Sequence, residues 1–116
     1  MLEKSRRLTR KSVFNFMYKK GERVNASHLS IVYAPSKNAF GRFGFVVSNK
    51  VGKATKRNKV KRRMRAIVRE NIKNIDNRYN FIIVARDNIA DITYSSLKAE
   101  IIYALKKSGH YCEKKN

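Results

Sequence analysis

Hydrophobic and polar residues alternate along two stretches of the chain, and each alternation predicts a half-buried β-strand. In residues 27–34, every second residue from Leu29 to Tyr33 is apolar or aromatic, so these side chains share one face. Residues 42–48 repeat the pattern. The segment 35–41 between them contains proline, serine, asparagine and glycine, which predicts a turn or loop.

Longer patterns predict a third strand and three helices. Residues 80–86 form a continuous apolar run, which is typical of a strand covered on both faces and therefore central or parallel. Apolar residues at helical spacing predict a long helix over about residues 56–74. A short helix is predicted over 13–20, and a last helix begins at a cap formed by Asp91 or Thr93.

The order of these elements is helix, two strands, helix, strand, helix, which predicts an α+β fold with a small mixed β-sheet packed with about three helices. The connection from strand 42–48 through the long helix to strand 80–86 would be a crossover between parallel strands. The length allows one domain, so residues 1–116 are predicted to form a single domain. Its basic termini, about 1–7 and 110–116, are expected to be frayed.

Charge narrows the possible partners of this domain. The chain has 28 Lys and Arg against 8 Asp and Glu, a formal net charge of +20. Self-repulsion on this scale opposes compactness, and a polyanion relieves it; nucleic acid is the first candidate and an anionic membrane the second.

The chain contains neither a run of about 18 apolar residues nor a secretory signal pattern, and Cys112 is its single cysteine. A cytoplasmic location is therefore expected.

The positive charge is concentrated at the long predicted helix. On a helical wheel the apolar residues form one stripe, and a wedge about 100° wide directly beside it is almost wholly cationic. Asn58 is the one neutral member of this wedge and can both donate and accept hydrogen bonds. Between Lys50 and Arg65 there are nine Lys and Arg and no acid. They are Lys50, Lys53, Lys56, Arg57, Lys59, Lys61, Arg62, Arg63 and Arg65.

Energetics distinguish this wedge from an ordinary solvated face. The helix contains several like-charge i,i+4 pairs, such as Arg57 with Lys61 and Lys61 with Arg65. Together they cost roughly 1–2 kcal/mol when no partner is present. A face that served only solubility would mix Glu with Lys, whereas phosphates reverse the sign of the cost and suit arginine forks. Because no zinc site or small helical DNA-reading pattern is present, RNA is preferred to DNA.

The same residues carry a family resemblance. The segment Arg57–Arg65 (RNKVKRRMR) resembles the helix signature of the bacterial ribonuclease P protein component. Residues 42–50 (RFGFVVSNK) are similar to the family's strand ending in Val-Ser-x-Lys, and Gly52-Lys53-Ala54 to its Gly-x-Ala turn. The likeness runs from about residue 6 to residue 107. Asn49 departs from the pattern, because lysine is frequent at that place in the family.

The resemblance implies a function and two sets of site residues. The chain would be a protein subunit of ribonuclease P that promotes endonucleolytic removal of the 5′ leader from precursor tRNA. One set would contact the ribonuclease P RNA: Lys50, Lys53, Arg57, Asn58, Lys61, Arg62 and Arg65. The other would line a cleft for the single-stranded leader: Phe14, Tyr18 and Tyr33. Phe16, by contrast, is predicted to be a core residue.

The resemblance also implies details of the fold that periodicity does not reach. The topology would be that of the second domain of ribosomal protein S5, with a left-handed βαβ crossover. Most such crossovers are right-handed, at a base rate of about 98%. The hand of the crossover is therefore expected from the resemblance alone.

The sequence predicts a binder without catalytic residues or a metal site of its own. The eight acids form no paired motif beyond Asp87 and Asp91, which flank the start of the last helix. His28, His110 and Cys112 have no partners at metal-ligand spacing. By resemblance the RNA subunit performs the hydrolysis and uses Mg²⁺, so the chain would be the non-catalytic component of a ribonucleoprotein endoribonuclease. Neither a membrane nor a small-molecule substrate is expected as a partner.

Two other interpretations are open at this point. A ribosomal or other structural RNA-binding protein accounts equally well for the charge, but not for the clustered signature and the aromatic residues. A cationic helix that binds membrane surfaces would need a free apolar face. The long helix is predicted to pack that face against the sheet.

Overall fold

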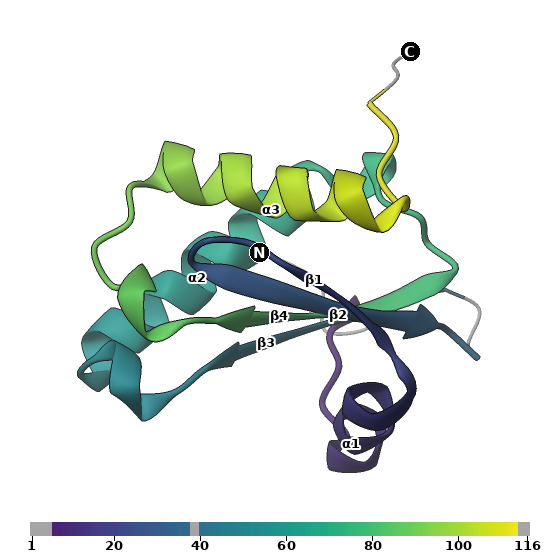
Figure 1. The fold of residues 1–116 in the computed structure, drawn as a ribbon, viewed down its shortest axis with the longest axis horizontal. Helices are drawn as coiled ribbons and strands as arrows, with labels where there is room; N and C mark the ends of the chain where they lie inside the picture. The colour runs from purple at the N-terminus through teal and green to yellow at the C-terminus, as the bar shows by residue number, and fades with distance from the viewer. Residues whose placement is uncertain (1–5, 38–39, 114–116) are drawn as a thin grey trace.

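A four-stranded sheet in the order β1-β2-β4-β3 forms the centre of the molecule, with helices on both of its faces (Figure 1). This is a computed structural model, and it describes residues 6–37 and 40–113. The main elements are α1 (Lys11–Lys20), β1 (Glu22–Asn25), β2 (Leu29–Pro35), β3 (Phe43–Val47), α2 (Ala54–Glu70), β4 (Tyr79–Ala85) and α3 (Tyr94–Ser108). The short 3₁₀ helices between them are labelled η2 (Asn49–Val51), η3 (Ile72–Asn74) and η4 (Asp87–Ile89).

The central position of β4 explains its unbroken apolar sequence. It pairs antiparallel with β2 and parallel with β3, so both of its faces are covered. Ile82 and Ile83 point to opposite faces, and neither is exposed at all. The predicted mixed sheet is confirmed, and β3, α2 and β4 form the expected connection between parallel neighbours. The hand of that crossover stays a prediction.

The two faces of the sheet carry separate apolar cores. The larger core joins the sheet to α2 and α3, and Leu29 and Ile31 of β2 belong to it. The smaller core joins the sheet to α1 and includes Val32, Ala34 and Met17. Side chains therefore alternate between the two cores along β2, as a half-buried strand requires. In Figure 1, α1 lies on one side of the sheet, and α2 and α3 lie on the other.

Strand β1 was not predicted from the sequence. Only Val24 of its four residues is buried, so no alternation extends far enough to be recognised. Its existence follows from pairing with β2 at the edge of the sheet. At the turn between these strands, the backbone N–H of His28 donates to Glu100 of α3 at 2.8 Å, and the His28 ring also contacts this carboxylate.

Both ends of the long helix α2 differ from the prediction. The predicted helix over 56–74 begins earlier, at Ala54, and ends at Glu70. At this end the carbonyl of Ile67 accepts from both the side-chain amide of Asn71, at 2.8 Å, and its backbone N–H, at 3.2 Å. Thr93 is the cap of α3, since its hydroxyl accepts from the backbone N–H of Ser96 at 3.2 Å.

The parts of the termini that the structure describes contact the body of the fold, and the expected fraying stays a prediction. The backbone N–H of Leu8 donates to the carbonyl of Phe43 at 2.7 Å, which attaches the chain before α1 to the edge of β3. After α3, Tyr111 forms a bridge with Ile75. The ring of His110 packs 3.8 Å from that of Tyr79, measured between centroids. The described segments before α1 and after α3 are therefore attached to the body of the fold.

Asp76 holds the segment after α3 in place. Its carboxylate accepts from the Arg78 guanidinium at 3.1 and 3.2 Å and lies 3.2 Å from Nδ1 of His110. The hydrogen bonds from Arg78, more than that with His110, lower the pKa of Asp76 to about 2.

Within the described ranges, no helix is both long and apolar enough to cross a membrane.

We predict a pH-dependent loss of stability in Asp76→Asn. Because the pKa of Asp76 is lower in the folded chain than in the unfolded chain, its contribution is complete above about pH 4 and disappears toward pH 2. Urea unfolding should show Asp76→Asn to be about 1 kcal/mol less stable near pH 6, after allowance for solvent screening. The difference should shrink as the pH falls below 4.

The matched control is Asp87→Asn, which removes an exposed carboxylate that makes no ion pair in the described part of the chain. It should change stability little at any of these pH values. An equal loss in both variants would contradict the role assigned to Asp76.

Candidate nucleic-acid interface

The apolar stripe of α2 fixes how the helix is turned. Val60, Met64, Ile67 and Val68 are buried in the larger core, and the last three are not exposed at all. These are the residues whose spacing predicted the helix. Because they are locked against the sheet, the rest of the helix surface has one fixed orientation.

One flank of this stripe carries the predicted cationic wedge. Arg57, Lys61 and Arg65 are half-buried and adjoin the core, while Asn58 and Arg62 are exposed. This gradient is the one that the helical wheel predicts. Within residues 6–37 and 40–113, none of the cations predicted to contact RNA forms an ion pair with a carboxylate.

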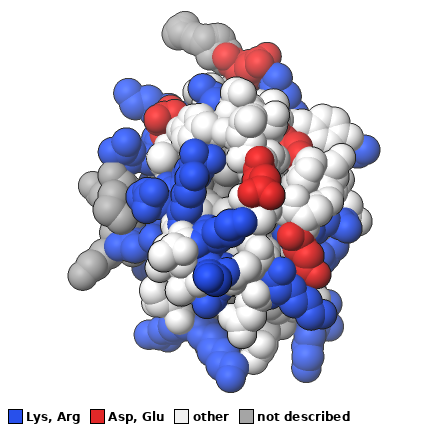
Figure 2. Space-filling model, turned by 90° about the vertical axis from the view of Figure 1, so that its left-hand side faces the viewer, with Lys and Arg blue, Asp and Glu red and all other residues white. Residues whose placement is uncertain are grey.

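The opposite flank of α2 differs. There Lys56 lies 3.7 Å from the carboxylate of Asp91, and the Arg63 guanidinium donates to the carbonyl of Ile92 at 3.4 Å. This flank therefore has a carboxylate beside it, whereas the wedge makes no ion pair in the described chain and only a hydrogen bond from Nε of Arg57 to the carbonyl of Gly52 at 3.2 Å. Figure 2 shows many Lys and Arg side chains on the side of the molecule that carries Lys53, with fewer acidic groups.

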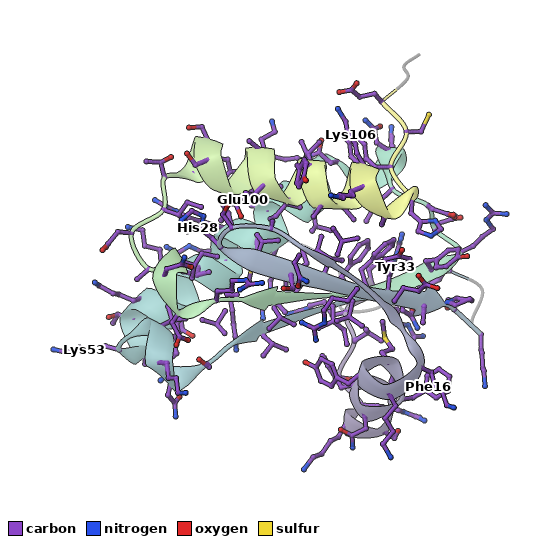
Figure 3. All side chains as sticks on the ribbon, in the orientation of Figure 1. Phe16, His28, Tyr33, Lys53, Glu100 and Lys106 are labelled. Carbon is purple, nitrogen blue, oxygen red and sulfur yellow. The ribbon has the colours of Figure 1, made fainter. Side chains whose placement is uncertain are left out.

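The first turn of α2 adds to the positive potential. Gly52 has φ of +151°, a backbone conformation that side chains disfavour, and this turn leads the chain from η2 into the helix. Lys53 stands at the N-cap without a side-chain cap, and the first turn contains no acid. The free N–H groups of this first turn and the helix dipole add partial positive charge beside the exposed Lys50 and Lys53. Figure 3 shows Lys53 pointing away from the body.

Arg65 connects the wedge to a hollow at the edge of β3. Its guanidinium carbon lies 5.9 Å from the centre of the Phe45 ring, and its buried Nε has no hydrogen-bond partner within the described chain. A buried donor without a partner is uncommon and indicates a place where an acceptor is missing. The hollow has a volume of about 480 Å³ and is lined by Arg7, Leu8, Thr9, Phe14, Phe43, Phe45 and Arg65.

Phe14 and Arg65 are thus brought together, although 51 positions separate them in sequence. Phe14 can pack closely against the sheet because Gly44 beneath it has no side chain. A Cβ at Gly44 would come within 2.6 Å of the Phe14 ring. The result is an aromatic ring and a guanidinium in one hollow, a combination that suits a stacked base beside a phosphate.

The other two predicted cleft aromatics do not join this hollow. Tyr18 is 43% exposed on α1, and burial raises its pKa more than the nearby Arg23 lowers it. Tyr33 points to the opposite face of the sheet, 5.1 Å from the ring of His110 (Figure 3). The grouping of Tyr33 with Phe14 is therefore wrong, because alternate residues of β2 face different cores. Whether Tyr33 contacts RNA elsewhere stays a prediction.

Phe16 is a further correction. It was predicted to be core but is 48% exposed. On α1 the buried positions are centred on Val13 and Met17, and Phe16 lies about 80° to one side of this centre while Phe14 lies on the other. A helical wheel of α1 contains this signal. Phe45 and Arg7, which line the hollow, were not identified as site residues, and no local pattern marks them.

These features define a class of protein: a small basic α+β domain that presents an uncompensated cationic helix beside an aromatic hollow, as RNA-binding domains do. Comparison with known proteins identifies the family. The family model for ribonuclease P matches residues 2–109. The chain belongs to the ribonuclease P protein family.

Individual relatives match this chain along nearly their whole length. The ribonuclease P protein component of Syntrophomonas wolfei is 32% identical over 100% of this chain and 98% of the relative. That of Finegoldia magna is 34% identical over 97% and 100%. Among solved structures, the RNase P protein of Staphylococcus aureus matches with a TM-score of 0.86 and 28% identity, covering 93% and 99%. That of Thermotoga maritima gives 0.80 and 26%, covering 87% and 96%.

The comparisons confirm the family resemblance and the α+β class. The chain is a protein subunit of ribonuclease P with a role in tRNA processing, and a ribosomal or other structural RNA-binding protein is not favoured. The assignment of individual RNA-contacting residues and the S5-like topology stay predictions. The structure is compatible with that topology.

We predict that Arg62→Ala weakens RNA binding through the loss of one phosphate contact. Arg62 is exposed on the wedge and has no partner in the described chain, so its removal should leave the fold unchanged. The slope of log affinity against log salt should fall by about one. Filter binding to ribonuclease P RNA over a range of salt concentrations measures this slope.

Lys107→Ala is the matched control, because it removes one exposed charge from α3, outside the wedge. If both variants lowered the slope equally, net charge rather than the wedge would determine binding.

Proposed function

We propose that this chain binds the catalytic RNA of ribonuclease P through the wedge of α2 and holds the 5′ leader of precursor tRNA beside α1. It would thereby promote endonucleolytic removal of the leader and production of mature tRNA 5′ ends. The observation that carries this proposal is the contrast between the two flanks of α2. One flank carries an ion pair within the chain, between Lys56 and Asp91, and the other carries none among the described residues.

The wedge is suited to the phosphate backbone of a folded RNA. Its cations lie in one row beside the core, and each phosphate contact releases a counterion, which drives association at moderate salt. Recognition through the backbone depends on the shape of the RNA rather than on base edges. Asn58 adds a neutral group that can contact a 2′-hydroxyl or a base edge.

The hollow at the edge of β3 is suited to a single strand. A base stacked on Phe14 would contribute about 1–3 kcal/mol without strong sequence preference, which a protein that accepts many leaders requires. Arg65 in the same hollow would contact the neighbouring phosphate. Since Arg65 also belongs to the wedge, the leader site and the site for the catalytic RNA would be contiguous.

We propose that the RNA subunit performs the hydrolysis with Mg²⁺ and that this chain contributes affinity. Its carboxylates support this division, because four of them pair with basic side chains within the fold instead of gathering around a common point. These pairs are Asp76 with Arg78 and His110, Asp91 with Lys56, Glu100 with His28, and Glu113 with Lys106. We also propose a cytoplasmic location, where precursor tRNAs are made.

Reconstitution tests this function directly. The chain should stimulate 5′ processing of precursor tRNA by its ribonuclease P RNA, most strongly at low Mg²⁺, because its cations supplement the screening that Mg²⁺ provides. Alone it should cleave nothing. Cleavage rates at several Mg²⁺ concentrations, with and without protein, measure the effect. Absence of stimulation at every concentration would disprove the proposal.

Phe14→Ala should impair recognition of the leader specifically. We expect affinity for leader-bearing precursor tRNA to fall about fivefold or more, with an unchanged salt slope, because a stacking contact and not a charge is lost. Substrate without a leader should be unaffected. Tyr103→Ala, which removes a 51% exposed aromatic from α3, is the control. Equal losses with and without a leader would contradict the leader site.

A further inference from the structure

Phe16 exposes an aromatic ring on the flank of α1 that faces away from the leader hollow. The ring is 48% exposed, although a side chain of this size on a ten-residue helix would be stabilised by burial. Val13 and Met17 occupy the buried side of the helix between Phe16 and Phe14. The two phenylalanines therefore serve different surfaces, and the leader site described above does not account for Phe16.

A second hollow lies beside this ring. It has a volume of about 180 Å³, far smaller than the hollow beside Arg65, and it has room for a single flat ring rather than for a helix or a duplex. Most of its wall is apolar. It is lined by Ser12, Val13, Phe16, Met17, Ala34, Pro35, Lys37 and Asn80.

Asn80 places an unused donor in the wall of this hollow. The residue is only 7% exposed, and its Oδ1 accepts from the backbone N–H of Arg42 at 2.9 Å. Oδ1 is thereby committed, and the amide orientation is set. Its Nδ2 has no hydrogen-bond partner among the residues that the structure describes. The buried side-chain polar atoms without a partner in the described chain are Nε of Arg42 and Nε of Arg65, so Nδ2 of Asn80 reaches solvent and is available to an acceptor on a ligand.

The charge around the hollow selects an anionic ligand. The ammonium of Lys37 lies 5.5 Å from the centre of the Phe16 ring, is exposed and forms no ion pair within the described ranges. Helix α1 contributes Lys11, Lys19 and Lys20 and contains no acid. A second copy of the chain is a poor occupant, because each copy has a net charge of +20 and would bring further lysines to this surface.

We infer that this second hollow binds one unpaired nucleobase of RNA. The base would stack on Phe16, a ring nitrogen or carbonyl of the base would accept from Nδ2 of Asn80, and Lys37 would move to the adjoining phosphate. This inference rests on the proposed function only in that the partner is RNA. The base belongs either to the precursor tRNA or to the catalytic RNA, and the chemistry of recognition is the same in both cases.

A binding measurement on the full chain tests the site without the holoenzyme. The probe is a fluorescent single-stranded RNA of about twelve nucleotides at physiological salt, within the range that one small domain covers. Phe16→Ala should weaken its binding at least about fivefold with an unchanged salt slope, and Phe16→Trp should retain it, since indole stacks as well. Lys37→Ala should instead lower the slope by about one. In wild type, the Asn80 side-chain amide resonances should shift on titration.

Controls separate the site from general effects. Because Phe16 is exposed, its variants should fold, which circular dichroism verifies, and Tyr103→Ala should bind the probe like wild type. The inference is overturned if Phe16→Ala binds as tightly as wild type. It is also overturned if sedimentation shows a dimer that Phe16→Ala abolishes, because Phe16 would then contact a second copy.

The reconstituted holoenzyme identifies the source of the base. A defect of Phe16→Ala that is confined to leader-bearing substrate assigns the base to the leader, and an equal defect on leaderless substrate or in holoenzyme assembly assigns it to the catalytic RNA. No defect in any of these assays overturns the inference for this enzyme. If wild type fails to stimulate cleavage while Phe16→Ala still loses oligonucleotide binding, the proposed function fails and the nucleobase site stands.

Discussion

The packing of one apolar stripe of α2 against the sheet determines most of what this molecule presents to its surroundings. Met64, Ile67 and Val68 are completely buried, and each such side chain contributes about 1.5–3 kcal/mol through burial. Their sum exceeds the roughly 1–2 kcal/mol lost to repulsion among the cations of the same helix. The core can therefore hold closely spaced positive charges in a fixed orientation before any partner neutralises them.

The rest of the fold determines which of these charges are available. The loop before α3 places Asp91 and the carbonyl of Ile92 against one flank of α2, so Lys56 and Arg63 are engaged there. No described element brings a carboxylate to the other flank. The wedge keeps its positive charge because the fold distributes its few acids unevenly.

Helix α1 adds aromatic surfaces on both sides of its buried stripe. Phe14 lies over Gly44 and meets Arg65 across the edge of β3, while Phe16 stands beside Asn80 at the start of β4. Phe14 shares its hollow with Arg65, and Lys37 lies 5.5 Å from the centre of the Phe16 ring. Stacking and phosphate contacts are thus paired twice in a small domain, a combination suited to single-stranded RNA.

The sequence by itself determined the features that depend on local periodicity. Spacing of 3.6 and 2 residues located α2, its wedge, β2 and β3, and a continuous apolar run located β4, because these patterns arise within one element. The signature Arg57–Arg65 identified the family for the same reason, since it lies on a single helix.

Only the tertiary structure decided which side chains meet. It placed Phe14 with Arg65 and sent Tyr33 to the other face, because strand pairing and helix docking join residues far apart in the chain. The edge strand β1 and the attached segment at His110 likewise exist through contacts with distant partners. Those contacts depend on how whole elements pack together, which no local pattern records.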